Sequence, residues 1–183
     1  MQDIGVLHNM CSSSLDEFLS VERNNISSGV SERNLCARFS IILERIAKEY
    51  GFHGYYADTE YNRKQNEKVK TILDDDYKVV NVTCDLILHS RGEVINRDNL
   101  IAIEMKKSTR PEKEKHSDRE RLRTLTKSSY DGVWSFDGET HPEHVCGYEM
   151  GIFVELDIEN GFCLVQRFEK GDFVNQDPVR RFL

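Results

Sequence analysis

The clearest hydrophobic pattern in the chain lies between Ser31 and Tyr50. Apolar residues recur there at spacings of three and four, which places them on one face of a helix. Ser31 is suited to cap the start of this helix, and Gly51 is suited to end it. We therefore predict a helix over residues 31–50 with one buried face, which comprises Leu35, Phe39, Ile42, Leu43, Ile46 and Tyr50.

The segments that follow have the apolar runs and turn residues of β-strands. Gly92 and Asn96–Asn99 separate two of these runs, which predicts a hairpin. A charged segment then leads to a second helix over residues 117–129, and Gly161 marks a turn between two final strands. This order predicts an α/β fold with a mixed central β-sheet flanked by helices. The predicted strands span residues 54–61, 79–89, 100–107, 149–157 and 162–168.

The first 30 residues are polar and are broken by stretches rich in serine and asparagine. Their pattern allows a short helix over residues 15–21 and indicates little else. We therefore expect residues 1–30 to be an N-terminal extension and residues 31–183 to form a single domain, a length that can bury a hydrophobic core.

The composition is ordinary for a water-soluble protein, with 38% hydrophobic and 31% charged residues. The chain has neither an apolar run of the roughly 20 residues that a membrane helix needs nor a signal-peptide pattern, so we expect a cytoplasmic protein without a membrane partner. Five scattered cysteines indicate neither a disulfide framework nor a structural zinc site. The net charge of −7 argues against a protein that coats nucleic acid, although a metal site can still bring phosphate to an acidic protein.

Charged residues interrupt the apolar strand pattern at two places. Asp85 lies within the run Val82–Leu88, and Glu104 and Lys106 end the next run. Because side chains alternate along a strand, Glu104 and Lys106 project from the same face. A hairpin centred near residues 94 and 95 places Asp85 opposite Glu104, where two carboxylates could share a divalent metal ion. Lys106 could then orient or deprotonate a water molecule, or hold a phosphate.

Glu32 adds a third carboxylate. It lies three residues before Leu35 and seven before Phe39, so it points along the apolar face of the first helix. A metal ion is one partner for such an inward acid. The alternative is that Glu32 interacts only with the dipole of its own helix, since acidic residues favour the first helical turn.

Asp85, Glu104 and Lys106 can also be interpreted as residues without a catalytic role. Glu104 and Lys106 could form a weak ion pair at a solvated strand edge. Asp85 could bind backbone groups at a turn or strand end. The two interpretations differ in whether Asp85 lies beside Glu104 or points away from it.

Together these residues resemble the PD-(D/E)xK nucleases, also called the restriction-endonuclease-like superfamily. The resemblance is carried by Asp85 in one strand, a gap of 18 residues, Glu104-Met105-Lys106 at the end of the next strand, and Glu32 on the preceding helix. Cys84 stands where the name of the motif has proline. The chain is more similar to stand-alone bacterial or phage-defence nucleases than to long restriction enzymes with their own specificity domain.

The resemblance implies a restriction-endonuclease-like core of a helix, three strands, a second helix and a further strand within residues 31–157. It also implies that Asp85, Glu104 and the backbone carbonyl of Met105 bind the metal ion. Glu32 would be the helix glutamate that some members add to the site, and Lys106 would be the catalytic lysine.

These observations lead to the hypothesis of a Mg²⁺- or Mn²⁺-dependent nuclease, an endonuclease that hydrolyses the phosphodiester bonds of DNA. Lys107 and a basic stripe of Arg119, Arg123 and Lys127 could grip phosphates, although a solvated helix face explains the stripe equally well. The alternative function is a non-catalytic protein- or nucleic-acid-binding module on the same fold, which the acidic composition suits. Cutting both strands of a duplex often calls for two copies of a site, so a homodimer or a protein partner is a further expectation.

Overall fold

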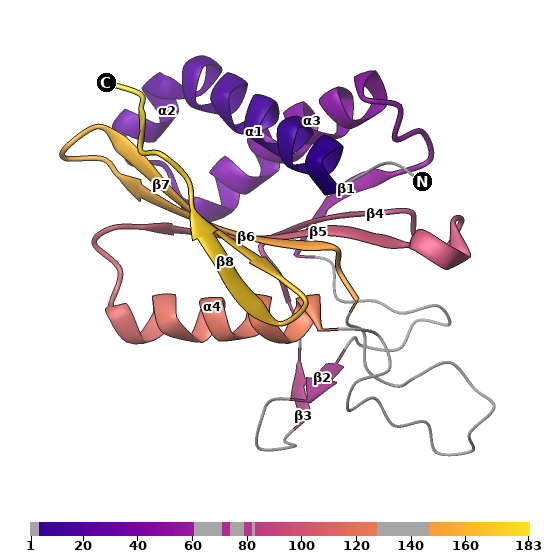
Figure 1. Ribbon diagram of the computed structural model, residues 1–183. Coiled ribbons are helices and arrows are strands. Elements are labelled where there is room, and N and C mark those ends of the chain that lie inside the picture. The colour runs from indigo at the N-terminus through magenta and orange to yellow at the C-terminus, as the bar shows by residue number, and fades with distance from the viewer. Residues whose placement is uncertain (1–3, 61–70, 74–78, 82, 128–146) are drawn as a thin grey trace.

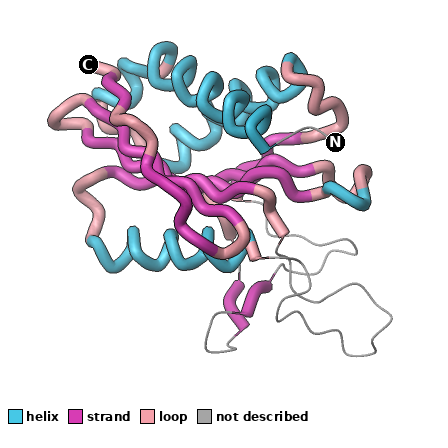
Figure 2. The backbone as a smooth tube through the Cα atoms, in the orientation of Figure 1, coloured by secondary structure: helices cyan, strands magenta, loops and turns pink. Residues whose placement is uncertain are grey.

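The computed structural model describes residues 4–60, 71–73, 79–81, 83–127 and 147–183 (Figure 1). They form three layers, in which helices cover both faces of a mixed β-sheet (Figure 2). The predicted α/β architecture with a mixed central sheet is confirmed. Among the described residues, no helix is both long and apolar enough to cross a membrane.

In the described part of the chain the main sheet has seven strands, most of which pair antiparallel. Their bounds are β1 (Tyr56–Thr59), β4 (Leu86–His89), β5 (Asn99–Lys107), β6 (Met150–Asp157), β7 (Phe162–Glu169), β8 (Asp172–Gln176) and β9 (Arg180–Arg181). The order across the sheet is β1-β4-β5-β6-β7-β8, with β9 paired to β7. Strands β5 and β6 are parallel, and the other pairs are antiparallel. A separate two-stranded sheet joins β2 (Thr71–Leu73) and β3 (Val79–Asn81).

The helices are divided between the two faces of the sheet. Helices α1 (Ile4–Val21), α2 (Arg23–Ser27) and α3 (Glu32–Glu49) lie on one side, and α4 (Glu112–Thr126) lies on the other (Figure 1). A short 3-10 helix, η2 (Ile95–Arg97), connects β4 to β5. Helix α3 confirms the first predicted helix, including its cap, because the Ser31 hydroxyl accepts a hydrogen bond from the Asn34 N–H (3.2 Å).

The N-terminal segment contributes to the core. Helix α1 begins at Ile4, well before the short helix expected at residues 15–21, and the rings of Phe18 and Phe39 pack at a tilt of 37° with their centroids 4.9 Å apart. Serines interrupt its apolar pattern, but the Ser14 hydroxyl donates to the Met10 carbonyl (2.8 Å) and is thereby accommodated inside the helix. Residues 4–21 therefore share one hydrophobic core with α3.

Several predicted boundaries were wrong. The strand expected over residues 79–89 is divided, since β3 pairs with β2 and only β4 joins the main sheet. Helix α4 begins at Glu112 rather than residue 117, and acidic residues in its first turn stabilise that earlier start through the helix dipole. Strands β8 and β9 were not predicted; every residue of β8 is exposed, so it lacks a hydrophobic alternation.

The sheet separates two hydrophobic clusters, and β5 contributes to both. Ile101, Ile103 and Met105 pack in the larger cluster beneath α1 and α3, whereas Ala102 packs in the smaller cluster beneath α4. This alternation means that the side chains of Glu104 and Lys106 project toward α4. The fold thus directs Glu104 and Lys106 of β5 at one helix.

Candidate active site

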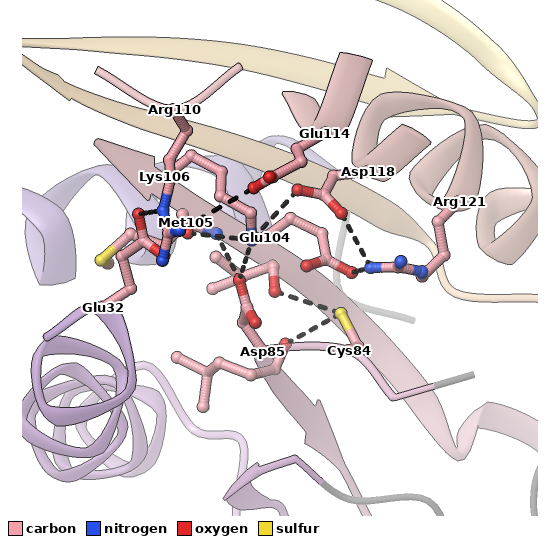
Figure 3. Close-up of polar contacts among 12 residues, drawn as sticks. Glu32, Cys84, Asp85, Glu104, Met105, Lys106, Arg110, Glu114, Asp118 and Arg121 are labelled. Carbon is pink, nitrogen blue, oxygen red and sulfur yellow. Dashed lines mark hydrogen bonds and ion pairs between the residues drawn. The ribbon is translucent and has the colours of Figure 1, made fainter. Parts of the chain in front are cut away.

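The candidate site lies where the β4–β5 hairpin passes under α4 (Figure 3). Leu86 pairs with Ile103, so Asp85, which directly precedes β4, is level with Glu104. This is the register that the sequence predicts for a hairpin centred near residues 94 and 95. The two carboxylates are close enough for Asp85 to raise the pKa of Glu104.

The Asp85 carboxylate is fixed by two donors. Its Oδ2 atom accepts hydrogen bonds from the Met105 N–H (2.9 Å) and from the Lys106 ammonium group (3.2 Å). The side chain is 29% exposed, so it borders solvent. Asp85 therefore does bind a backbone group, but it does so while lying beside Glu104 and Lys106 rather than pointing away from them.

Glu104 is fully buried, and only one of its two carboxylate oxygens has a partner. Arg121 of α4 donates to Oε1 (2.5 Å), whereas Oε2 has no hydrogen-bond partner among the described residues. Burial raises the pKa of Glu104 well above the ordinary carboxyl range, and Asp85 adds to this while Arg121 opposes it. A buried carboxylate oxygen without a partner is costly, so Glu104 is poised for a cation or a proton. A solvated ion pair at a strand edge is not what the structure contains.

Lys106 is the third member of the charged group that we call the cluster, which consists of Asp85, Glu104 and Lys106. Its Nζ atom contacts Asp85 Oδ2 (3.2 Å), Asp118 Oδ2 (3.1 Å) and the carbonyl oxygen of Met105 (3.4 Å). Burial alone would lower the pKa of Lys106, but Asp85, Asp118 and Glu104 outweigh it and hold that pKa above its ordinary value. Lys106 is therefore an ammonium group in this arrangement.

Helix α4 adds two residues that sequence reasoning missed, Asp118 and Arg121. The Arg121 guanidinium joins Asp118 Oδ1 (3.0 Å) to Glu104, so both residues are connected to the strand residues below them. One signal was present in the sequence: Asp118 precedes Leu122 by four and Leu125 by seven, which places it on the apolar stripe of a largely polar helix. We refer to Asp118 and Arg121 as the α4 pair.

Glu32 lies at the edge of the cluster with partners of its own. Its carboxylate accepts hydrogen bonds from the Lys107 N–H (2.9 Å) and from two nitrogens of Arg110 (3.0 and 2.9 Å). Burial alone would raise the pKa of Glu32, but these donors hold it below its ordinary value. The structure thus brings Glu32 to the end of β5 next to Lys106, and its contacts with Lys107 and Arg110 stabilise the turn after β5.

Cys84, the residue before Asp85, is buried at the start of the hairpin. Its Sγ atom donates to the Ile103 carbonyl (3.1 Å), which ties the start of the hairpin to β5. Burial raises the pKa of the Cys84 thiol well above its usual range, so the group is unreactive. The thiols of Cys11, Cys36 and Cys163 are also free and buried.

The predicted phosphate-binding residues lie apart from the α4 pair. Arg119 donates to Gln166 (2.8 Å), contacts Glu112 (2.5 Å) and stacks over the Phe153 ring, on the part of α4 that packs on β6 and β7. Arg123 pairs with Glu120 and lies over the Phe168 ring, and Lys127 caps the end of the helix. Lys107 donates to the Gly29 carbonyl (2.8 Å). In this structure these side chains stabilise packing, and Lys107 alone neighbours the cluster.

Only a few groups at the cluster could hold a divalent metal ion. Within the described part of the chain, no three His, Cys, Asp or Glu side chains are arranged to hold a metal. The groups that could hold one are the unpartnered Oε2 of Glu104, the carboxylate of Asp85 and the Met105 carbonyl, with water completing the shell. Oxygen ligands of this kind suit Mg²⁺ and Mn²⁺, and Mg²⁺ usually keeps several waters.

Comparison with known protein families, with curated proteins and with solved structures gives no significant match for this chain. Its chemistry therefore has to be inferred from the cluster itself.

Proposed function

We propose that the chain is a Mg²⁺- or Mn²⁺-dependent deoxyribonuclease of the PD-(D/E)xK type, an endonuclease that cuts at the Asp85–Glu104–Lys106 cluster. The observation that supports this most strongly is the fully buried Glu104 with one unpartnered oxygen, placed beside Asp85. Two neighbouring carboxylates repel each other, and a divalent cation relieves both the repulsion and the missing contact.

The arrangement of elements also supports the proposal. Helix α3, strands β1, β4 and β5, helix α4 and strand β6 follow in the order that the resemblance implies, with the separate β2–β3 sheet inserted between β1 and β4. Strands β1, β4, β5 and β6 are also neighbours in this order across the sheet. Helix α4 connects the parallel pair β5 and β6. The proposed chemistry would therefore lie at the end of β5, before the turn that leads into α4.

In the proposed mechanism each residue has a distinct task. A bound divalent ion would polarise the scissile phosphate and lower the pKa of its water. Asp85 and Glu104 would hold that ion, with Asp85 oriented by the Met105 N–H and Glu104 by Arg121. Lys106, as an ammonium group, would donate hydrogen bonds to the phosphate or orient the attacking water, a role that suits its raised pKa better than proton removal.

The test is nicking of supercoiled plasmid DNA with Mg²⁺ or Mn²⁺. We expect the wild type to convert plasmid to open-circular and linear forms, and Asp85→Asn and Glu104→Gln to reduce the rate by on the order of a hundredfold or more. Glu120→Gln removes an acid of α4 that points to Arg123, so this matched control keeps its activity. If neither metal supports nicking, or if the two variants cut as fast as the wild type, the proposal is wrong.

One observation favours a second function, a non-catalytic protein- or nucleic-acid-binding module. Arg119 and Arg123 are occupied by partners within the chain, and the net charge is −7, so these two residues of the predicted basic stripe offer DNA little free positive charge. This alternative predicts that the wild type binds neither Mg²⁺ nor Mn²⁺ and leaves both DNA and RNA intact.

A further inference from the structure

Lys106 competes with the proposed metal ion for the same oxygens. Its ammonium group lies 3.2 Å from Asp85 Oδ2 and 3.4 Å from the Met105 carbonyl, and these are two of the groups that would hold the ion. Two cations cannot share these oxygens without strong repulsion. Metal binding therefore requires another acceptor for the Lys106 ammonium.

Asp118 is placed to be that acceptor. Its Oδ2 atom lies 3.1 Å from Lys106 Nζ, and it belongs to α4 rather than to the hairpin. The side chain is only 7% exposed, so the contact is sheltered from water and its electrostatic attraction is stronger than at the surface. Asp118 can thus hold the Lys106 ammonium after a metal ion has bound the Asp85 carboxylate and the Met105 carbonyl.

Arg121 keeps Asp118 in this role. It donates to Asp118 Oδ1 (3.0 Å), which leaves Oδ2 directed at Lys106. The same guanidinium nitrogen donates to Glu104 Oε1 and leaves Oε2 free (Figure 3). The α4 pair therefore orients one oxygen on each of two acids.

We propose that Asp118 is a positioning residue that draws the Lys106 ammonium away from Asp85 and Met105 when a divalent cation binds. This inference rests on the proposed function, since it requires a metal at the Asp85–Glu104 pair. Its consequence is that Asp118 favours metal binding through Lys106, without being a metal ligand itself. Lys106 is thereby kept beside the metal, where its ammonium can meet a phosphate.

The test is a double-mutant cycle on metal affinity, measured by calorimetric titration of Mn²⁺ alone into the full chain. We expect Asp118→Asn to weaken Mn²⁺ binding about tenfold, because Lys106 then stays on the hairpin oxygens. Lys106→Met should bind Mn²⁺ at least as tightly as the wild type, since the competing ammonium is gone. In the Lys106→Met background, Asp118→Asn should change the affinity less than about twofold.

Two further variants serve as controls. Asp118→Glu retains the carboxylate and should keep most of the wild-type affinity, and Glu120→Gln removes a charge from the same helix without contacting Lys106. Thermal unfolding confirms that each variant is folded. Asp118→Ser replaces Asp118→Asn if the latter does not fold.

The outcomes separate the inference from the function on which it rests. If Asp118→Asn weakens binding equally in both backgrounds, Asp118 acts by its own charge and the inference fails. An unchanged affinity in the single variant also overturns it, while the metal site stands. If the wild type binds no Mn²⁺, with or without DNA, the proposed function itself fails.

Discussion

The residue that defines this molecule chemically is Glu104. It is buried in the middle of a sheet, its pKa is raised by burial, and one oxygen has no partner in the described structure. Groups in such surroundings usually reduce stability, and they are concentrated at functional sites. We therefore expect Glu104 to contribute to ligand binding and to lower the stability of the fold.

This leads to a prediction about stability. Glu104→Gln ends the repulsion with Asp85 at nearly constant volume and keeps an oxygen that can accept from Arg121, so without metal it should leave the free energy of unfolding unchanged or raise it by about 1 kcal/mol. Mn²⁺ should raise the Tm of the wild type but not that of Glu104→Gln, because a ligand stabilises only the state that binds it.

Thermal unfolding with and without Mn²⁺ measures both effects. Glu120→Gln is the matched control and should keep the metal-induced rise in Tm. A Glu104→Gln variant that is much less stable than the wild type would show that Glu104 maintains the fold instead.

At the scale of elements, the contact between α4 and β6 positions the α4 pair. Gly151 of β6 allows this contact, because a Cβ atom there would lie 3.1 Å from Thr126 Cγ2 and 3.3 Å from Leu122 Cβ. On its other side, the added atom would lie 3.3 Å from Phe168 Cβ. The neighbouring Cβ atoms are attached to backbone and cannot move aside freely.

Gly151→Ala should therefore push α4 away from the sheet. We expect a loss of about 1–3 kcal/mol in the free energy of unfolding, as for other overpacked cores. We also expect weaker Mn²⁺ binding, because Asp118 and Arg121 move with the helix. Gly54→Ala is a control at a glycine outside this contact, and it should lose stability through its positive φ (80°) while the folded protein keeps its metal affinity. Full metal affinity in Gly151→Ala would contradict the role assigned to α4.

Sequence patterns predicted the elements with a clear apolar signal. Helix α3 has one apolar face, and the β4–β5 hairpin has apolar runs that are buried on both sides. A hairpin centre near residues 94 and 95 then placed Asp85 beside Glu104, as the structure does. Helix α4 was placed only approximately because most of its residues are charged. Its role could not be inferred, since a buried ion pair such as Arg121 with Glu104 and a solvated charge look alike in sequence. The basic stripe was visible as a pattern, but its partners on β6 and β7 depend on tertiary contacts.

At the scale of the whole molecule, the N-terminal helices and the sheet share one core. Phe18 of α1 is fully buried against Phe39 of α3, and the same cluster continues to Met105 of β5. The layer that covers one face of the sheet is thus built partly from residues 4–21.

Phe18→Ala should therefore destabilise the entire chain. We expect a loss of about 3–5 kcal/mol and a single cooperative transition at lower denaturant concentration, with α-helix and β-sheet signals lost together. Val21→Ala, at a 61% exposed position of the same helix, should change stability by less than about 0.5 kcal/mol. Separate transitions for helix and sheet would mean that α1 is an independent unit.

The parallel pairing of β5 with β6 has a consequence for the order in which the chain is made. Protein synthesis proceeds from the N-terminus, and segments fold as they emerge. When β5 and α4 have left the ribosome, β6 is still to come, so α4 lacks the strand on which it rests. Asp118 and Arg121 then have no fixed place above Glu104. A nascent chain would carry all the charged residues of the cluster while the cluster itself is still unformed, and its chemistry would begin only after residues 150–157 have been added to the sheet.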